Sequence, residues 1–544
     1  MTRGAGRGAY GDPMHVVLVH AAFPRTYWGF QHALAVTGKR ATLPPLGLLT
    51  VAAHLPRAWE LRLRDLNVEA LTDADLAWAD AVLVGGMLVQ APSMHEVLAR
   101  ARLAGKRTIV GGPAASTSPA LFAADVVFRG EVEGRERELH DAITGEARAH
   151  DDASASAPVT ASDPHRPDLG AARVPRFDLL RLDAYTTMAV QTSRGCPYHC
   201  EFCDVIELFG RVPRVKAPAQ VTAELAALHR AGWRGPVFVV DDNFIGNLKL
   251  ARALLPAIEA WQRAHDGGFE LYTEASVNLA NDPALLAALV GAGFTAVFVG
   301  IETPSREALR AAGKTQNLKL DLADAVDRIT AAGLEVMGGF IVGLDGDDAG
   351  AFEALAAFLR DAPIPLAMIG VLTALPGTAL TRRLRREGRL RTDSGGDQFA
   401  RPNFEPAMDE HALLDGYARL MAEVYSPAGY LRRCAAYLRR APLAERGRAR
   451  EGSARYLARA IWYLGVRGER RHLFWQLVGL GARRRSLAAL TWAVVHAIQG
   501  EHLVRYTRED VLPRVREAAG AVTAERATRA SRAAMPAPRP APTA

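Results

Sequence analysis

Three cysteines stand close together at Cys196, Cys200 and Cys203, in a CxxxCxxC pattern. Thiolates are the protein ligands of iron–sulfur clusters. Three thiolates on one loop can hold three irons of a [4Fe–4S] cluster and leave the fourth iron open for a substrate or cofactor. A structural zinc site needs four ligands, and His199 or the distant Cys434 could supply the fourth. Because such zinc sites favour CxxC pairs, the spacing favours the cluster.

The cysteines follow the first strand of a repeating strand–helix pattern over residues 186–375. Amphipathic helices, for example Pro218–Ala231 and Leu320–Ala332, separate the strands. The expected strands are Met188–Thr192, Val237–Asp241, Glu270–Ala275, Ala296–Ile301, Glu335–Val342 and Ala367–Leu372. Six such units predict a partial (β/α)6 barrel, whose active site gathers at the carboxyl ends of the strands.

A second alternation of short apolar runs and helical patterns fills residues 14–145. It predicts an α/β domain with a doubly wound parallel sheet. Ligands of such sheets bind beyond the carboxyl ends of the strands. Five glycines fall at expected strand ends, namely Gly85, Gly86, Gly111, Gly112 and Gly130. They could line a ligand site or only permit tight strand-to-helix turns, and the pattern leaves both interpretations open.

The composition changes around these two α/β regions. Residues 146–175 are rich in Ala, Ser and Pro and aperiodic, which predicts a linker before the barrel of residues 176–400. Residues 401–520 lack strand alternation and are expected to be helical. Residues 521–544 have low complexity and are expected to form a disordered tail.

The overall composition excludes several classes of protein. The chain has 544 residues, of which 49% are hydrophobic and 23% charged, and it contains four cysteines. It is therefore not wholly disordered, collagen-like or built on a disulfide framework. No apolar run reaches the roughly 18 residues of a membrane span, and Met14–Phe23 fits a buried strand better than a secretory signal. We expect a cytoplasmic protein.

The net charge of +7 is concentrated near the carboxyl end of the chain. Residues 431–520 contain 19 arginines and 7 acidic residues, which gives +12 and leaves −5 for the rest. The same segments carry the aromatic residues Trp462, Tyr463, Phe474, Trp475 and Trp492. Basic residues interleaved with aromatic ones suit peripheral contact with an anionic membrane, here its inner face. A solvated basic face over a helical core fits equally well.

The cysteine motif at the end of the first barrel strand resembles that of the radical S-adenosylmethionine (SAM) enzymes. The resemblance implies a [4Fe–4S] cluster on Cys196, Cys200 and Cys203, whose open iron binds the amino and carboxylate groups of SAM. It also implies reductive cleavage of SAM to a 5′-deoxyadenosyl radical, with an electron donor of the flavodoxin or ferredoxin type. Phe202 matches the family's aromatic position, whose backbone lies near the adenine.

Two further strand ends match SAM-binding segments of this family. Asp241, Asp242 and Asn243 occupy the place of the amino-group-binding segment, although either acid could instead cap the following helix. The resemblance suggests that Glu274 and Ser276 contact the ribose and the carboxylate. A carboxylate suits the ribose because it can accept hydrogen bonds from both hydroxyls.

Later strand ends carry the remaining candidates for the SAM site. Glu302 could contact the cofactor or form a local ion pair with Arg306. Gly338 and Gly339 could allow the backbone to approach the adenine or methionine part of SAM, or could serve only strand–helix packing. We predict no acid–base catalyst, because the cofactors perform the difficult chemistry.

A doubly wound domain ahead of such a barrel resembles the cobalamin-binding radical SAM class. The turns at Gly111-Gly112 and Gly130-Glu131 sit where that class places them, and we take these residues and Gly85-Gly86 as candidates for binding cobalamin. The DxHxxG loop that ligates cobalt in methionine-synthase-type domains is absent, which implies cobalamin without a histidine on cobalt. A domain that has lost cobalamin and only packs on the barrel is the alternative.

The resemblance extends to the subfamily that includes the hopanoid C-2 methylases, through the segments Cys200–Arg214, Asp241–Asn247, Tyr272–Ser276 and Ala374–Thr378. It implies a cobalamin-dependent C-methyltransferase that acts on an unactivated carbon of an apolar polycyclic lipid. The alternative is a cyclase or rearranging enzyme of tetrapyrrole or secondary metabolism, without net methyl transfer. We expect no nucleic-acid substrate, because neither cysteines for a second cluster nor an RNA-binding barrel is evident.

Overall fold

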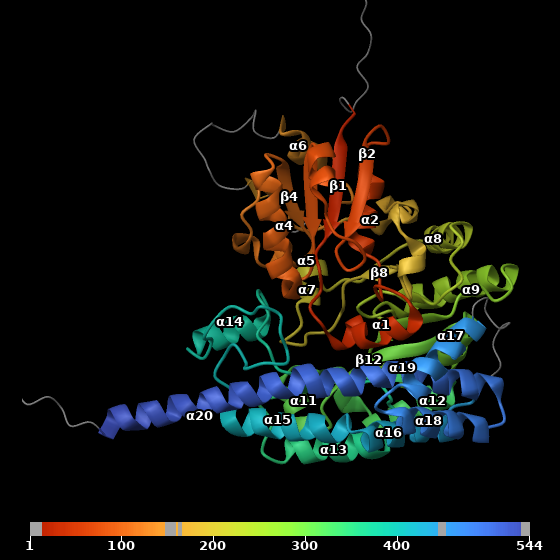
Figure 1. Ribbon diagram of the computed structural model, residues 1–544, viewed down its shortest axis with the longest axis vertical. Helices are drawn as coiled ribbons and strands as arrows, with labels where there is room; N and C mark the ends of the chain where they lie inside the picture. Colours follow the sequence, from red (N-terminus) through yellow and green to blue (C-terminus); the bar gives the residue numbers. More distant parts are fainter. Residues whose placement is uncertain (1–12, 147–158, 161–165, 444–452, 535–544) are drawn as a thin grey trace, which may run out of the picture.

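The computed structural model of the chain describes residues 13–146, 159–160, 166–443 and 453–534. Two α/β units lie one above the other, and a group of helices packs beneath the second unit (Figure 1). Among the described residues, no helix combines the length and the apolar character that crossing a membrane requires.

The first sheet has six parallel strands in the order β2-β1-β3-β4-β5-β6. The strands are β1 His15–His20, β2 Glu60–Asp65, β3 Ala81–Gly85, β4 Arg107–Gly111, β5 Val126–Val127 and β6 Val159–Thr160. The main helices are α2 Leu46–His54, α3 Asp73–Trp78, α4 Ala91–Leu103, α5 Pro113–Thr117 and α6 Glu136–Thr144. Successive side chains of β1 enter two different cores, because strand residues alternate between faces: Val17 and Val19 join one, Val16 and Leu18 the other. The doubly wound fold is confirmed.

The expected linker over residues 146–175 contains regular structure. Its short strand β6 pairs with β5 at the edge of the first sheet, and Leu169–Ala171 forms a 3-10 turn. Two β-branched residues are too few to produce a recognisable period, so the sequence pattern does not reveal this strand. Residues 147–158 and 161–165 of the segment lie outside the described residues.

The second sheet is also parallel, with the order β14-β13-β12-β11-β10-β7. Its strands are β7 Met188–Val190, β10 Val237–Val239, β11 Leu271–Ala275, β12 Phe294–Glu302, β13 Glu335–Val342 and β14 Ala367–Val371. Its helices are α8 Pro218–Arg230, α9 Leu248–Ala264, α10 Pro283–Gly291, α11 Arg306–Ala311, α12 Leu322–Ala331, α13 Ala351–Asp361 and α14 Ala379–Arg386. All six expected strands are present, and the sheet is an open, partial barrel.

The carboxyl-terminal region is helical, as expected. Its helices are α15 Glu410–Val424, α16 Pro427–Arg440, α17 Ser453–Ala460, α18 Arg471–Arg483, α19 Leu487–Tyr506 and α20 Leu512–Ala534. Helix α19 crosses beside the barrel strands (Figure 1). There the Glu335 carboxylate of β13 accepts a hydrogen bond from Trp492 Nε1 (2.7 Å) and lies 2.8 Å from His496 Nε2. Helix α19 is thereby anchored to the barrel.

Residues 521–534, expected to be disordered, instead form the last part of α20. Val522 is buried, and Glu525 forms an ion pair with Arg401 (2.7 Å). The Ala-rich composition that gives this segment its low complexity also favours helix. Residues 535–544 lie outside the described residues.

Buried ion pairs join the carboxyl edges of the two sheets. Arg194 lies just before the cysteine loop. Its Nη1 is 2.5 Å from Glu131 Oε2, and its Nη2 is 2.9 Å from Glu133 Oε1. Arg214 Nη2 binds the other oxygen of Glu131 at 2.7 Å. Burial would raise the pKa of Glu133, but the Arg194 guanidinium outweighs it and holds that pKa below its usual range. The first domain is therefore fixed directly to the cysteine loop.

Replacing Glu133 should loosen this junction. The Glu133→Gln variant deprives buried Arg194 of one counter-charge, and removing one partner of a buried pair typically costs about 3–5 kcal/mol. We expect faster amide hydrogen exchange at residues 128–135 and 193–203 and a lower melting temperature. Arg137→Gln, which alters a side chain that is 93% exposed, is the matched control. Unchanged exchange in both segments would show that these ion pairs do not hold the domains together.

Candidate functional site

A short antiparallel ribbon supports the base of the cysteine loop. Strand β8 (Ser193–Arg194) pairs with β9 (Arg214–Val215). Between β8 and the first cysteine, Gly195 has a φ of 100°, and a Cβ there would lie 2.9 Å from the Gly210 carbonyl oxygen. Cys196 N–H donates to the same oxygen at 3.1 Å. The loop can therefore turn toward the barrel only with glycine at this position.

Amide groups face the cysteine sulfurs from two later loops of the barrel. Asn243 Nδ2 lies 3.8 Å from Cys196 Sγ, and Gln316 Nε2 lies 3.7 Å from Cys200 Sγ. Such donors stabilise sulfur that carries negative charge. Burial raises the pKa of both Cys200 and Cys203, so these thiols keep their protons until metal displaces them. Three thiols with amide donors are a donor set that fits a [4Fe–4S] cluster.

The two residues that could complete a zinc site have other partners. The His199 ring faces the Arg211 guanidinium. Cys434 is fully buried in α16 beside Tyr430, and burial raises its pKa to about 12. Cys434 therefore has the surroundings of an ordinary buried thiol.

Glu302 pairs with Lys314 and not with Arg306. The carboxylate of Glu302 and the Lys314 ammonium form a buried ion pair, while Arg306 donates to the Leu318 carbonyl (2.7 Å). The expected local pair with Arg306 is therefore wrong. Glu302 has a φ of 65° next to a register shift in β12, and such irregularities redirect side chains at strand ends. The Glu302 carboxylate is turned toward the cysteine loop.

Lys314 and Gln316 are site residues that the sequence motifs did not identify. The Lys314 ammonium lies 5.9 Å from the centre of the Phe202 ring. Burial would lower the pKa of Lys314, but Glu302 and the Cys200 thiol together raise it. Both residues lie more than ten positions beyond the end of β12, in a segment that contains no recognisable sequence motif. Lys314 supplies a fixed positive charge beside the thiols.

Carboxyl groups without a cationic partner gather on the other side of the site. Asp242 Oδ2 is buried and has no hydrogen-bond partner. Burial, followed by the charges of Asp241 and Asp204, raises the pKa of Asp242 to about 7. Burial, followed by Asp242 and Asp241, raises the pKa of Glu274 to about 8. An orphaned acidic pair of this kind fits a ligand that carries positive charge, such as SAM.

Asp241 has a structural role that differs from both expected roles, which were binding the amino group of SAM and capping the following helix. It is fully buried and accepts hydrogen bonds from Thr192 N (2.7 Å), Ser193 N (3.0 Å) and Ser193 Oγ (2.7 Å). It does not cap α9, whose first turn is capped by Asn247. Asp241 therefore holds the start of β8 and leaves Asp242 as the acid available to a ligand.

The predicted residues Asn243 and Ser276 lie together. Asn243 Oδ1 accepts from Ser276 N (3.2 Å) and Ser276 Oγ (3.3 Å).

The two glycines of β13 differ: a Cβ on Gly338 would meet Phe340 at 2.7 Å in the outer helical layer, whereas one on Gly339 would meet Phe298 at 2.6 Å. Strand–helix packing explains Gly338, and the close approach of the Phe298 ring explains Gly339.

Aromatic side chains form the inner face next to the acids. Tyr272 stacks on Phe238 with ring centres 4.6 Å apart, and Trp28 packs on Phe298 at 5.2 Å. Tyr272 and Phe298 remain partly exposed although they lie on central strands, and Trp28 is 39% exposed. The barrel interior thus presents accessible aromatic surface beside Glu274.

Packing explains two of the five glycines at the carboxyl edge of the first sheet. A Cβ on Gly85 would lie 3.1 Å from Leu48, and one on Gly86 would lie 2.9 Å from the sulfur of Met94. These two positions serve close contact between strand and helix, a role that neither interpretation included.

The other three glycines leave the edge free of side chains. Gly112 and Gly130 have φ values of 88° and 80°, and Gly111 ends β4 beside them. This edge faces the cysteine loop, because α5 packs against α7 (Val205–Phe209) just after Cys203 (Figure 1). A glycine-lined edge that Cβ atoms would fill fits a large flat ligand such as cobalamin.

The Glu131 side chain takes part in the junction between the two domains. Both of its carboxylate oxygens are bound, one by Arg194 and one by Arg214. It thereby positions the two domains.

Two hollows, of about 590 and 530 Å³, are lined mainly by residues of the second unit. The smaller one lies against the cysteine loop and is lined in part by Arg166, His199, Arg211 and Arg382. The lining also includes Glu207, which pairs with Arg382 (2.9 Å), so three arginines face one acid. This net positive charge suits an acidic partner surface.

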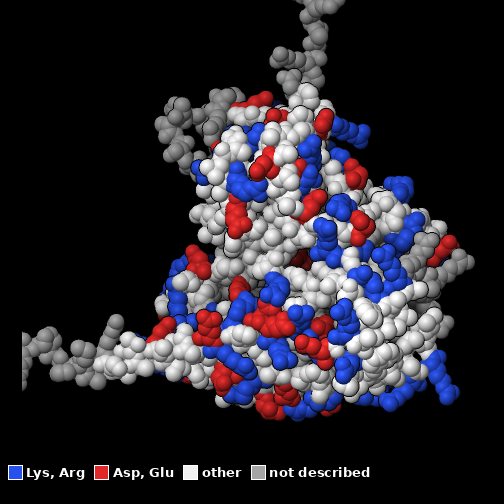
Figure 2. Space-filling view, viewed as in Figure 1, with Lys and Arg blue, Asp and Glu red and all other residues white. Residues whose placement is uncertain are grey.

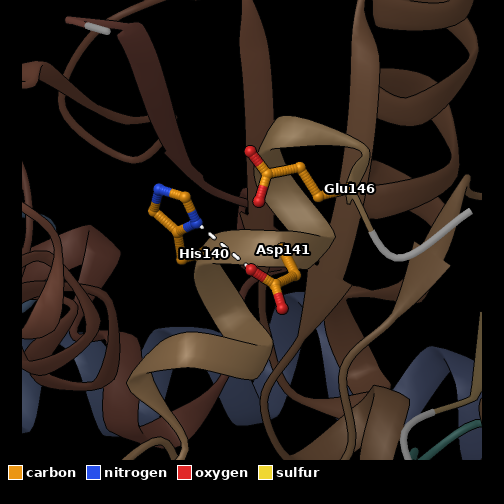
Figure 3. Close-up of side chains that lie close together, drawn as sticks. All are labelled: His140, Asp141 and Glu146. Carbon is orange, nitrogen blue, oxygen red and sulfur yellow. Dashed lines mark hydrogen bonds and ion pairs between the residues drawn. The ribbon is translucent and has the colours of Figure 1, made fainter. Parts of the chain in front are cut away.

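A separate group of metal-binding residue types lies at the end of α6. Figure 3 shows His140, Asp141 and Glu146 turned toward one another, with His140 Nδ1 3.3 Å from Asp141 Oδ1. Helix α6 ends beside Arg107 at the start of β4, since Arg107 Nε donates to the Ala142 carbonyl. This is the edge opposite the cysteine loop, so the group takes no part in the site.

Three family models match the chain. Residues 35–140 match the B12 binding domain, residues 190–359 the radical SAM superfamily, and residues 378–512 a domain of unknown function, DUF4070. Among solved structures, the cobalamin-dependent SAM radical enzyme OxsB, with aqua-cobalamin and SAM bound, shares the fold. It covers 94% of this chain and 84% of its own, with a TM-score of 0.59 and 14% identity.

Two curated relatives align with nearly the whole chain. An uncharacterised methyltransferase of Synechocystis sp. (strain PCC 6803) is 39% identical over 91% of this chain and 92% of its own. The hopanoid C-2 methylase of Rhodopseudomonas palustris is 34% identical over 91% of this chain and 94% of its own. The cofactors are therefore a [4Fe–4S] cluster, SAM and cobalamin. The chain belongs to the cobalamin-dependent radical SAM methyltransferases, in the group that includes the hopanoid C-2 methylase.

Proposed function

We propose that this enzyme transfers a methyl group to an unactivated carbon of an apolar polycyclic lipid of the hopanoid kind. The observation that carries the proposal is the 34% identity with the hopanoid C-2 methylase over 91% of the chain. The inner face of the barrel supports it, because Trp28, Tyr272 and Phe298 offer aromatic surface to a fused apolar ring system.

The residues of the site have distinct parts in this proposal. When bound, the cluster, SAM and cobalamin supply the radical and the methyl group. Asp242 and Glu274 balance the positive charge of SAM, and Asn243 with Ser276 orients it next to Cys196. Lys314 offsets the negative charge of the thiolates.

The basic hollow beside the cysteine loop is the proposed docking place of the electron donor. Arg166, Arg211 and Arg382 line it, and His199 stands between the first two cysteines. Flavodoxin- or ferredoxin-type proteins with acidic surfaces would approach the cluster there, because opposite charges steer such encounters.

An anaerobic assay with SAM carrying a labelled methyl group tests the proposal. The reconstituted enzyme, a reductant and a hopanoid substrate should yield labelled hopanoid together with 5′-deoxyadenosine and S-adenosylhomocysteine. Replacing Cys196, Cys200 or Cys203 by alanine should abolish all three products and the absorbance of the cluster. The Cys434→Ser variant should keep the three products and the absorbance. Formation of 5′-deoxyadenosine without S-adenosylhomocysteine would contradict methyl transfer and favour a cyclase or rearranging enzyme.

The stability of the iron-free chain should depend on pH through Asp242 and Glu274. Their pKa values are about 7 and 8 in the folded chain and near 4 when unfolded, so between pH 5 and 8 the folded form holds more protons. Stability should therefore fall as pH rises through this window. Asp242→Asn with Glu274→Gln should raise the melting temperature at pH 8.5 by about 3 °C or more, but not at pH 5. Glu60→Gln, on an exposed side chain, is the control; an equal effect at both pH values would refute the assignment.

Trp28 should affect substrate binding more than chemistry. Trp28→Ala removes an exposed ring of the proposed substrate surface, and losing one aromatic contact with the substrate costs about 0.5–1.5 kcal/mol, or about two- to tenfold in KM. Cleavage of SAM without lipid should be unaffected, as should all parameters of the control variant Leu121→Ala in the first domain. A KM that stays at the wild-type value would exclude Trp28 from the substrate site.

A further inference from the structure

Exposed apolar side chains concentrate in one part of the carboxyl-terminal region. Of the large hydrophobic residues that are exposed in the described parts of the chain, half lie between residues 456 and 495. They are Tyr456, Leu457, Trp462, Tyr463, Val466, Trp475, Leu487 and Val495. Trp462 is 51% exposed and Leu487 64%. Such a concentration on a folded chain marks a surface that contacts something else.

Two aromatic residues of the same region belong to the core instead. Phe474 is buried, and Trp492 stacks on Tyr437 while donating to Glu335. The sequence pattern grouped them with Trp462 and Trp475, which the structure exposes. The interior of these helices is thus already filled, and the exposed residues are not needed to complete it.

The exposed residues come from elements that pack on one another. Helix α17 continues into a π-helical turn, η10 (Ile461–Val466), and α18 packs against both this turn and α19. Trp475 Nε1 donates to the Gly465 carbonyl at 3.0 Å, so the α18 ring lies across the turn. Figure 2 shows an expanse of uncharged surface over α17 and α18, with basic residues at its border. We call this surface the α17–α18 face.

The charge of this part of the chain has one sign. Residues 453–500 contain eight arginines and a single acidic residue, Glu469. Arg459 is bound to carbonyls of α1 (Gln31–Thr37), and Arg470 is paired with Glu501. Six arginines are exposed, namely Arg455, Arg467, Arg471, Arg483, Arg484 and Arg485. The face is therefore apolar and aromatic with a basic border.

We propose that the α17–α18 face docks on a bilayer surface that contains anionic phospholipids. Tryptophan and tyrosine favour the boundary between headgroups and acyl chains, and each arginine near an anionic surface adds to binding. A second copy of the chain is a poor occupant, because a symmetric contact would bring two faces of the same charge together. The bilayer matches both the apolar centre and the basic border.

Docking there would place the lipid next to the barrel interior, a step that rests on the proposed function. Helix α1 packs against α17 and α19, and Arg459 donates to the carbonyls of Ala35 and Val36 at its end. Trp28, which covers Phe298, lies just before α1. One helix thus separates the docked surface from the aromatic inner face, so a membrane lipid could reach the site without crossing water.

Sedimentation with vesicles tests the docking without turnover. The full chain should bind phosphatidylcholine vesicles with 30% phosphatidylglycerol, and 0.5 M salt should weaken the binding. Trp462→Ser with Val466→Ser should weaken it at least tenfold, as should Arg483→Gln, Arg484→Gln and Arg485→Gly together. Arg485 has a φ of 50°, so glycine there removes charge while relieving strain, and the fold should be retained.

A matched variant and a second measurement complete the test. Leu103→Ser with Arg263→Gln and Arg419→Gln changes equally exposed residues elsewhere and should bind vesicles as the wild type does. Wild-type binding by the two α17–α18 variants would overturn the proposal. Concentration-dependent dimers in sedimentation velocity, lost in those variants, would assign the face to a second copy instead. Methyl transfer to detergent-dispersed substrate, measured separately, distinguishes failure of docking from failure of the proposed function.

Discussion

The buried ion pairs between Arg194 and the two glutamates Glu131 and Glu133 are the constraint on which the rest of the structure depends. They join the turn after β5 to the residue that precedes the cysteine loop. The chemistry of this family requires two large cofactors to share one substrate, so the edges of two separately folded sheets must face each other at a fixed separation. Buried charges enforce this, because each loses a counter-charge if the edges part.

The site at this junction separates its charges: the cation lies beside the thiols, and the unpaired acids lie on the other side. Lys314, held by Glu302, lies beside the thiols that become anionic on metal binding, whereas burial and repulsion from neighbouring acids raise the pKa values of Asp242 and Glu274 on the other side of the site. Aromatic side chains lie beyond the acids, toward Trp28. In the proposed function, this order leads from the metal ligands through SAM to the apolar substrate, and the α17–α18 face continues it to the proposed lipid surface.

Local patterns predicted much of this organisation. The spacing of three cysteines identified the cluster loop, and the strand–helix period identified all six barrel strands. The pairings between distant segments were not accessible: Lys314 with Glu302, Gln316 with Cys200, and Glu131 with Arg194 depend on how loops meet in space. The helical end of α20 was missed because its low complexity resembles that of a disordered tail. Short-range periodicity determines the elements, but tertiary contacts determine which charged residues become partners.

Electron paramagnetic resonance of the loaded enzyme tests the central claim most directly. In enzyme that contains both cofactors, reduction of the cluster should accelerate the spin relaxation of cob(II)alamin, because the junction holds the two paramagnetic centres near each other. The Arg194→Met variant should retain both cofactors but show a weaker, more heterogeneous effect. Relaxation of wild-type cob(II)alamin that is the same with an oxidised or a reduced cluster would contradict the account.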